Sequence, residues 1–156
     1  MLGSSSGLGR QAEAVGLEQT FVILKPSAVS RGLVGEIVSR FERKGLRLVG
    51  LKLWRISKAE AERLYHVHRG KPFFEGLLEA ITSGPVVLLV LEGREAVQVV
   101  RKLIGATDPV KAEPGTVRGD YGLEITDNLV HASDSRESFE LECFIFFTPE
   151  ELQKTH

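Results

Sequence analysis

The chain contains a single cysteine, Cys143, and this scarcity excludes two kinds of structure. One cysteine can form neither an internal disulfide nor a structural zinc site, so a reducing compartment is expected. Long apolar runs are also missing. The longest run, Pro85 to Leu91, is much shorter than the roughly 20 residues that cross a bilayer, and it suits a buried strand. We therefore expect a cytoplasmic protein without a membrane partner.

An excess of either charge is absent as well, since the net charge is -1 and the pI is near 6.4. Nucleic-acid-binding domains usually carry a clear basic excess, so no nucleic-acid partner is expected, and any basic site must be local. What is present fits one globular domain: 156 residues, 42% of them hydrophobic and 26% charged.

The first 19 residues differ in composition from the rest. Their glycine-rich stretch, Gly3 to Gly9, has the spacing of a dinucleotide-binding loop, but such a loop must follow a strand. Only two residues precede it, so we interpret residues 1–19 as a flexible extension, an expression remnant or an over-long start. The domain is then expected over residues 20–156.

Apolar periodicity predicts alternating strands and helices after Thr20. Gly45 fits a helix C-cap, Gly50 a bulge, and Ser57 with Glu60 a capping box. The expected strands are 21–24, 46–56, 86–91 and one around residue 131; the expected helices are 33–45, 57–66, 72–81, 95–103 and 135–144, with a long loop at 105–121. This order fits a ferredoxin-like α/β sandwich with an antiparallel four-stranded sheet covered by helices, although periodicity alone also allows a small doubly wound sheet.

A lone histidine, His131, lies in the stretch Asn128-Leu129-Val130-His131-Ala132-Ser133-Asp134-Ser135. Leu129 and Val130 predict a strand that ends there, and Ser133 with Asp134 predicts the N-cap of the following helix. An imidazole would then lie near a helix N-terminus, where anions bind. Neutral imidazole is also a competent phosphate acceptor. The plainer interpretation is a capped helix after an edge histidine.

This stretch resembles the active-site motif of nucleoside diphosphate kinases, and the resemblance runs from Thr20 to Leu152. The other matching motifs follow in the family's order: Thr20-Phe21-Val22-Ile23-Leu24-Lys25-Pro26, Arg31-Gly32-Leu33-Val34-Gly35-Glu36-Ile37, Lys71-Pro72-Phe73-Phe74-Glu75-Gly76-Leu77, Ser83-Gly84-Pro85-Val86, Pro114-Gly115-Thr116-Val117-Arg118-Gly119-Asp120 and Pro149-Glu150-Glu151-Leu152. The resemblance implies the ferredoxin-like fold. It also implies transfer of the terminal phosphate of a nucleoside triphosphate such as ATP to a nucleoside diphosphate, in a ping-pong cycle through a phosphohistidine.

The resemblance assigns roles to three groups of residues. His131 would be the nucleophile, oriented by Glu142 with Ser133 in support. Phosphate contacts are implied for Lys25, Arg101, Thr107 and Arg118, contacts near the reacting phosphate and sugar for Tyr65 and Asn128, and base contacts for Phe73, Leu77 and Ile125. Magnesium would be bound through the nucleotide phosphates, with no metal ligands from the protein. No Walker loop, GxxxxGK[ST], occurs in the chain.

Several points remain alternatives. Ser27, Ala132 and Asp108 depart from the family's usual aspartate, glycine and asparagine, and the Ala132 methyl group could narrow the space beside the imidazole. A catalytically weak nucleotide-binding regulator on the same fold is the alternative function. The family buries the loop 105–121 between the subunits of a hexamer, so we expect a homohexamer, with a tetramer as the alternative.

Two aromatic pairs in the sequence also bear on the site. Only one of the adjacent Phe73 and Phe74 can face outward, so either could belong to the core. His66 and His68 suggest a metal site, but residues two apart on a helix face different sides, and a zinc site there is not expected without further ligands.

Overall fold

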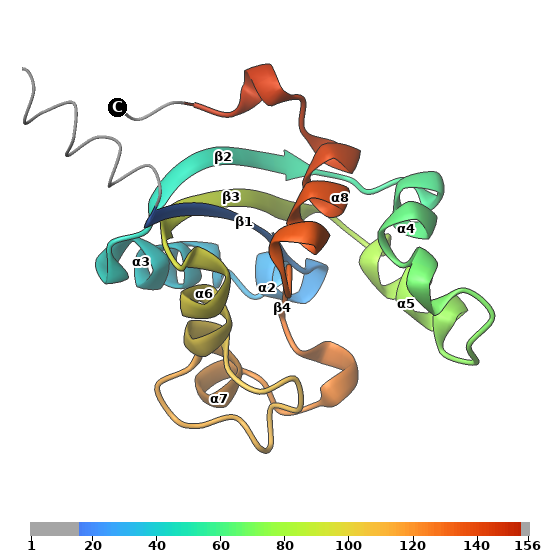
Figure 1. Cartoon of the computed structure of the whole chain (residues 1–156). Coiled ribbons are helices and arrows are strands. Elements are labelled where there is room, and N and C mark those ends of the chain that lie inside the picture. Colours follow the sequence, from blue (N-terminus) through green and yellow to red (C-terminus); the bar gives the residue numbers. More distant parts are fainter. Residues whose placement is uncertain (1–15, 154–156) are drawn as a thin grey trace, which may run out of the picture.

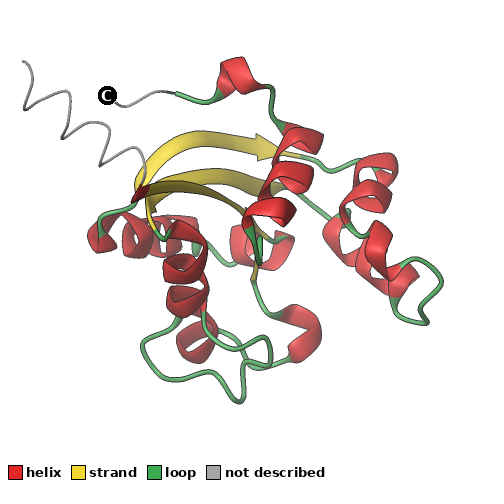
Figure 2. Cartoon of the chain, in the orientation of Figure 1, coloured by secondary structure: helices red, strands yellow, loops and turns green. Residues whose placement is uncertain are grey.

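The computed structural model describes residues 16–153. Its elements are β1 (Leu17–Leu24), α2 (Pro26–Ser30), α3 (Val34–Lys44), β2 (Arg47–Trp54), α4 (Lys58–Leu64), the 3₁₀ helix η1 (His66–His68), α5 (Phe74–Ile81), β3 (Val86–Arg94), α6 (Ala96–Ile104), α7 (Val117–Tyr121), η2 (Ile125–Asp127), β4 (Val130–Ala132), α8 (Arg136–Phe146) and η3 (Pro149–Glu151). The sheet order is β2-β3-β1-β4, and every neighbouring pair is antiparallel (Figures 1 and 2). The fold is therefore the expected ferredoxin-like sandwich, and the doubly wound parallel sheet is excluded.

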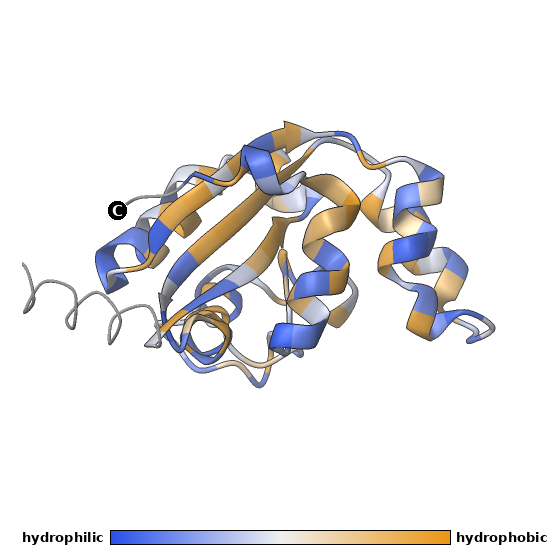
Figure 3. Ribbon diagram, turned by 45° about the horizontal axis from the view of Figure 1, so that its top comes forward, coloured by the Kyte–Doolittle hydropathy of each residue, from blue (hydrophilic) through white to orange (hydrophobic). Residues whose placement is uncertain are grey.

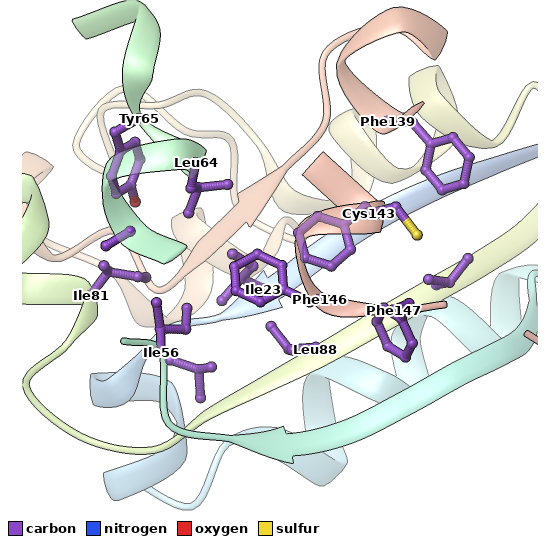
Figure 4. Close-up of a cluster of buried hydrophobic side chains, with 14 of the residues drawn as sticks. Ile23, Ile56, Leu64, Tyr65, Ile81, Leu88, Phe139, Cys143, Phe146 and Phe147 are labelled. Carbon is purple, nitrogen blue, oxygen red and sulfur yellow. The ribbon is translucent and has the colours of Figure 1, made fainter. Parts of the chain in front are cut away.

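Two apolar cores lie on opposite faces of the sheet, because successive residues of β1 point to opposite sides. Phe21 and Ile23 face α4, α5 and α8, in the cluster shown in Figure 4. Val22 and Leu24 face α2, α3 and α6. All four side chains are fully buried. Figure 3 shows the hydropathy of these elements, with mostly orange strands and helices that alternate between orange and blue.

Three local signals of the sequence are confirmed. Gly45 is the C-cap of α3 with a φ of 107°, a left-handed conformation that glycine adopts without strain. The β2–β3 register shifts between Leu48 and Gly50, and the carbonyl of the intervening Val49 accepts a hydrogen bond from the Gln153 amide at 2.8 Å. Ser57 forms the expected capping box at the start of α4.

Three boundaries differ from expectation. β1 begins at Leu17, so residues 17–19, which the sequence predicts to be part of the extension, pair with β3. Their half-buried, mixed-polarity side chains gave no apolar run to detect. The loop 105–121 ends in the short helix α7, capped by Thr116. The N-cap of α8 is Ser135, whose hydroxyl accepts from the Ser138 amide at 3.0 Å; Ser133 and Asp134 precede the cap. Residues 1–15 of the expected extension lie outside the described residues.

Cys143, on the buried face of α8, lies in the core, where burial raises the pKa of its thiol to about 12. It is therefore protonated at neutral pH and packs as an apolar residue. Among the helices of residues 16–153, none is long and apolar enough to cross a membrane.

Candidate active site

The site centres on His131, the middle residue of the three-residue strand β4. It pairs with Ile23 of β1, so the core strand fixes its backbone position. Its side chain is half-buried, and its Nε2 lies 2.8 Å from Oε1 of Glu142 on α8. The Ser133 hydroxyl donates to the same carboxylate oxygen at 2.9 Å. The contacts that we expected among these three residues are thus present.

This arrangement determines which ring nitrogen of His131 carries the proton in the neutral ring. A carboxylate can only accept hydrogen bonds, so Nε2 carries the proton in the neutral ring. The other nitrogen, Nδ1, then keeps its lone pair. The geometry therefore orients the imidazole and leaves Nδ1 as its basic nitrogen.

A tight turn leads into β4. Leu129 has a φ of 73°, and the Val130 amide donates to the Asn128 carbonyl at 2.8 Å across it. This is the pattern of a γ-turn with positive φ, which is rare and strained for a residue with a side chain. The Lys25 amide holds the Leu129 carbonyl at 2.9 Å, and the Leu129 side chain is fully buried.

Arg118 braces this turn, a role that the sequence did not reveal. Its guanidinium donates to three backbone carbonyls: Nε to Asn128 at 3.1 Å, and the two terminal nitrogens to Val130 at 2.6 Å and Gly105 at 2.9 Å. Only 7% of Arg118 is exposed. These partners all lie 10 to 13 residues away along the chain, so no short motif encodes them.

Asn128 connects two other parts of the site. Its side-chain oxygen accepts from the Lys25 ammonium at 2.6 Å, and its amide nitrogen donates to the Thr107 carbonyl at 3.1 Å. Asn128 is buried, whereas Thr107 is exposed on the loop after α6. The Thr107 backbone is therefore fixed beside the site, and its side chain is free to face a ligand.

Three cations from separate segments converge near His131. Burial, with a smaller contribution from Arg118, lowers the pKa of Lys25 to about 8. Burial and the charge of Arg101 lower the pKa of Arg118 to about 10. Arg101 itself contacts the carbonyl of Ala132 at 3.5 Å. The three positive charges repel one another, and a bound anion would reduce this repulsion. Phosphate-transfer sites need such cations, because they stabilise the negative charge of the phosphate.

Aromatic rings form the opposite wall. Tyr65 is buried, and its ring meets that of His131 edge-on at a centroid distance of 6.4 Å. Burial, with the charge of Glu142, raises the pKa of Tyr65 to about 12, so its hydroxyl is protonated at neutral pH. Phe73 is 47% exposed whereas Phe74 is 8% exposed, so Phe73 is the one that faces outward.

His68 also lines the site, although the sequence suggests only a metal-binding role for it. Its ring lies 5.3 Å from that of Phe73 and 6.3 Å from that of Tyr65. Burial, Lys71 and His131 lower its pKa. The short 3₁₀ helix η1 turns it toward His131, and the two residues line one hollow together with Glu142.

A second hollow lies between α5 and η2. Leu77 lines it together with Lys25 and Tyr65. Ile125, at the start of η2, is 56% exposed. The residues expected to contact a base thus lie on the two elements that flank this hollow.

The three departures from the family pattern have ordinary places in the structure. The Ser27 hydroxyl donates to the Asp127 carboxylate. Ala132 is buried and pairs with Val22. The Asp108 carboxylate accepts from the Val110 amide at 3.1 Å, closing a turn. None of them displaces a site residue.

The fold and the site together define a phosphotransferase, with an oriented histidine facing a cluster of cations. Comparison with known proteins identifies the family. The family model for nucleoside diphosphate kinase matches residues 18–152. The nucleoside diphosphate kinase of Hyperthermus butylicus is 58% identical over 136 residues (87% of this chain, 96% of the relative), and that of Pyrococcus furiosus is 59% identical over 139 residues (87% and 86%).

Solved structures agree. A halophilic nucleoside diphosphate kinase from Halobacterium salinarum, in complex with CDP, matches with a TM-score of 0.87 at 49% identity, covering 89% of this chain and 93% of that one. The Aquifex aeolicus nucleoside diphosphate kinase matches with a TM-score of 0.85 at 40% identity, covering 88% and 99%. The chain belongs to the nucleoside diphosphate kinase family, and its function is the transfer of phosphate between nucleoside triphosphates and diphosphates. Nothing in the comparisons favours the catalytically weak regulator.

Proposed function

We propose that this enzyme transfers phosphate in a ping-pong cycle through Nδ1 of His131. The observation that carries the proposal is the bond between Nε2 and Glu142, since it leaves Nδ1 as the basic nitrogen. In the first half-reaction Nδ1 attacks the γ-phosphorus of a nucleoside triphosphate such as ATP. The bond from that phosphorus to the bridging oxygen breaks, and the nucleoside diphosphate leaves with that oxygen.

The second half-reaction reverses this chemistry with a different nucleotide. A terminal oxygen of the new nucleoside diphosphate attacks the phosphorus, the bond to Nδ1 breaks, and a nucleoside triphosphate leaves. Glu142 stays hydrogen-bonded to the Nε2 proton throughout, so its charge stabilises the phosphorylated ring. Ser133 holds the carboxylate in place.

The remaining residues would bind the nucleotide. Lys25, Arg101 and Arg118 would face the phosphates with the Thr107 hydroxyl, because their mutual repulsion falls when an anion enters. Tyr65 and Asn128 would contact the reacting phosphate and the sugar. Phe73 would stack on the base, with Leu77 and Ile125 beside it. The complex of the Halobacterium relative with CDP supports a nucleotide ligand.

Magnesium would be held by the nucleotide phosphates. Among the described residues, no group of three or more His, Cys, Asp or Glu side chains is placed to hold a metal ion. The proposed ion would instead enter with the nucleotide, with phosphate oxygens as ligands. Mg²⁺ is commonly bound in this way, because it prefers oxygen ligands. When bound, the ion would neutralise phosphate charge, while Lys25 and Arg118 bind the remaining oxygens.

We further propose a cytoplasmic homohexamer, with a tetramer as the alternative. The edge strand β2 exposes Leu51 and Leu53, and the loop region exposes Val110 and Leu123, at 55% to 71% of their surface. Apolar side chains on a sheet edge and on a loop are typical of surfaces that another subunit covers.

Covalent labelling tests the proposed mechanism. Incubation with γ-labelled ATP and magnesium, without an acceptor, should leave phosphate on His131 that is acid-labile and base-stable. A nucleoside diphosphate should then discharge it. Absence of label with intact nucleotide binding would contradict the phosphohistidine.

Two variants distinguish the residue that reacts, His131, from the residue that orients it, Glu142. His131→Ala should bind nucleotide through the three cations yet transfer nothing, and undiminished turnover in this variant would refute the mechanism. Glu142→Ala should retain reduced activity, because Glu142 orients the ring without reacting.

A further inference from the structure

The segment that precedes His131 is joined to the start of α2 by three hydrogen bonds. The Lys25 amide donates to the Leu129 carbonyl, and the Lys25 ammonium donates to the Asn128 side chain. The third bond runs from the Ser27 hydroxyl to the Asp127 carboxylate. The first two contacts bear on the site already described, whereas the third has no assigned role. It holds a carboxylate on the hollow that the Lys25 ammonium also lines.

The second hollow is lined by few charged side chains. Of the described residues that line it, Asp127 is the one acidic side chain and Lys25 the one basic side chain. Arg118, from α7, adds a positive charge that acts on Lys25. Tyr65, from the end of α4, also faces the hollow but remains neutral. Asp127 is therefore the counter-charge on this side of the lysine.

We propose that Asp127, oriented by Ser27, is a positioning residue that provides the counter-charge for Lys25 and keeps its ammonium group charged to bind phosphate. The inference rests on the proposed role of Lys25 in the site. Ser27 holds the carboxylate on η2 facing α2, where an unrestrained exposed side chain would turn toward solvent.

The consequence concerns pH. Burial and Arg118 lower the pKa of Lys25 to about 8, while Asp127 acts in the opposite direction. Lys25 is charged below this pKa and loses its proton above it. Removing the charge of Asp127 makes the cation less stable, so Lys25 should lose its proton at a lower pH. Because Asp127 is exposed, solvent screens the effect, and we expect a shift of about 0.5 to 1 pH unit.

Asp127→Asn tests this directly, because the amide oxygen can still accept from Ser27 while the charge is lost. The titration of Lys25 can be followed by ¹³C NMR after reductive dimethylation of the lysines, with Lys25→Arg to assign the signal. The midpoint should fall by about 0.5 to 1 unit in Asp127→Asn and by less in Ser27→Ala. Glu79→Gln, which removes an exposed charge from α5, should leave it unchanged. An unchanged midpoint in Asp127→Asn overturns the inference.

Kinetics separate this inference from the proposed function. The ratio of wild-type to Asp127→Asn kcat/KM should rise by about two- to fivefold between pH 7 and pH 9, as the midpoint shift requires. A shifted midpoint with no change in this ratio supports the counter-charge but contradicts the proposed phosphate-binding role of Lys25.

Discussion

At the scale of single residues, Glu142 determines what His131 can do. One carboxylate oxygen accepts from both the ring Nε2 and the Ser133 hydroxyl. The three residues lie on a strand, on the segment after it and on a helix, so their geometry depends on the packing of α8 against β1. Tyr65 lies beside the imidazole and Phe73 lies beside His68, and their burial differs sharply: Phe73 is exposed and Tyr65 is buried. This contrast supports the proposed roles, in which Phe73 meets the base and Tyr65 lies near the reacting phosphate.

Phe73→Ala should lower kcat/KM for every nucleoside diphosphate by a similar factor, roughly ten- to a hundredfold, because stacking accepts any base. Competition between purine and pyrimidine diphosphates measures this. The wild-type enzyme should show only a modest preference among bases. Phe144→Ala, which truncates a similarly exposed ring on α8, is the matched control. A preference of several orders of magnitude for one base would contradict this expectation.

At the scale of elements, Arg118 joins three segments through carbonyl groups alone. Its fork holds the end of α6 at Gly105, the γ-turn at Asn128 and the strand at Val130. Lysine carries the same charge but cannot reach three carbonyls in a fixed plane. The helix α7 thus positions both the turn before His131 and a positive charge.

Arg118→Lys should therefore loosen the loop 105–121 and the turn at Leu129. We expect the free energy of unfolding to fall by about 2 to 3 kcal/mol, because buried carbonyls lose their donors. We also expect kcat/KM to fall roughly a hundredfold through misplacement of the histidine. Thermal unfolding and hydrogen exchange across the loop measure these effects. Arg43→Lys, at an exposed position on α3, is the control; equal behaviour of the two variants would count against the brace.

Local signals in the sequence predict the secondary-structure elements better than they predict the contacts between side chains. The C-cap at Gly45 and the capping box at Ser57 depend on neighbours within a few residues, so they could be predicted. The helix α7 has five residues among glycines and prolines, too few for a periodic pattern. The bonds of Arg118 and the pairing of Ser27 with Asp127 join segments far apart in the chain. They follow from the tertiary fold, and only a structure reveals them.

At the scale of the whole molecule, the sheet has an unprotected edge. β2 lies at one end of the sheet and exposes Leu51 and Leu53. Val110, on the loop before α7, and Leu123, just after α7, are also exposed. Pro109 is buried beneath this loop: a side chain added at Gly122 would come within 2.9 Å of it. The loop is therefore held in one conformation by packing inside its own subunit, which would present its apolar residues to a partner.

Pro109→Ser should weaken the assembly, because it removes this packing and lets the unfolded chain sample more conformations, at a cost of about 0.4 to 1 kcal/mol. Light scattering over a dilution series should show a hexamer for the wild type and smaller species for the variant. Lys111→Ser, on the same loop but exposed, should assemble like the wild type. A stable wild-type monomer at working concentration would refute the assembly.

The clustered cations also link folding to the cell's nucleotide pool. Burial and repulsion from a neighbouring arginine lower the pKa values of Lys25 and Arg118. Both groups remain charged at neutral pH. The native state therefore contains a repulsion that the unfolded chain lacks. Any polyanion that enters the site relieves it, and a ligand that binds only the native state at about 100 times its Kd adds roughly 2.7 kcal/mol of stability. With nucleotide bound to these cations as proposed, the substrate would also stabilise the fold, and starvation for nucleotides would leave the enzyme closer to unfolding and to proteolysis.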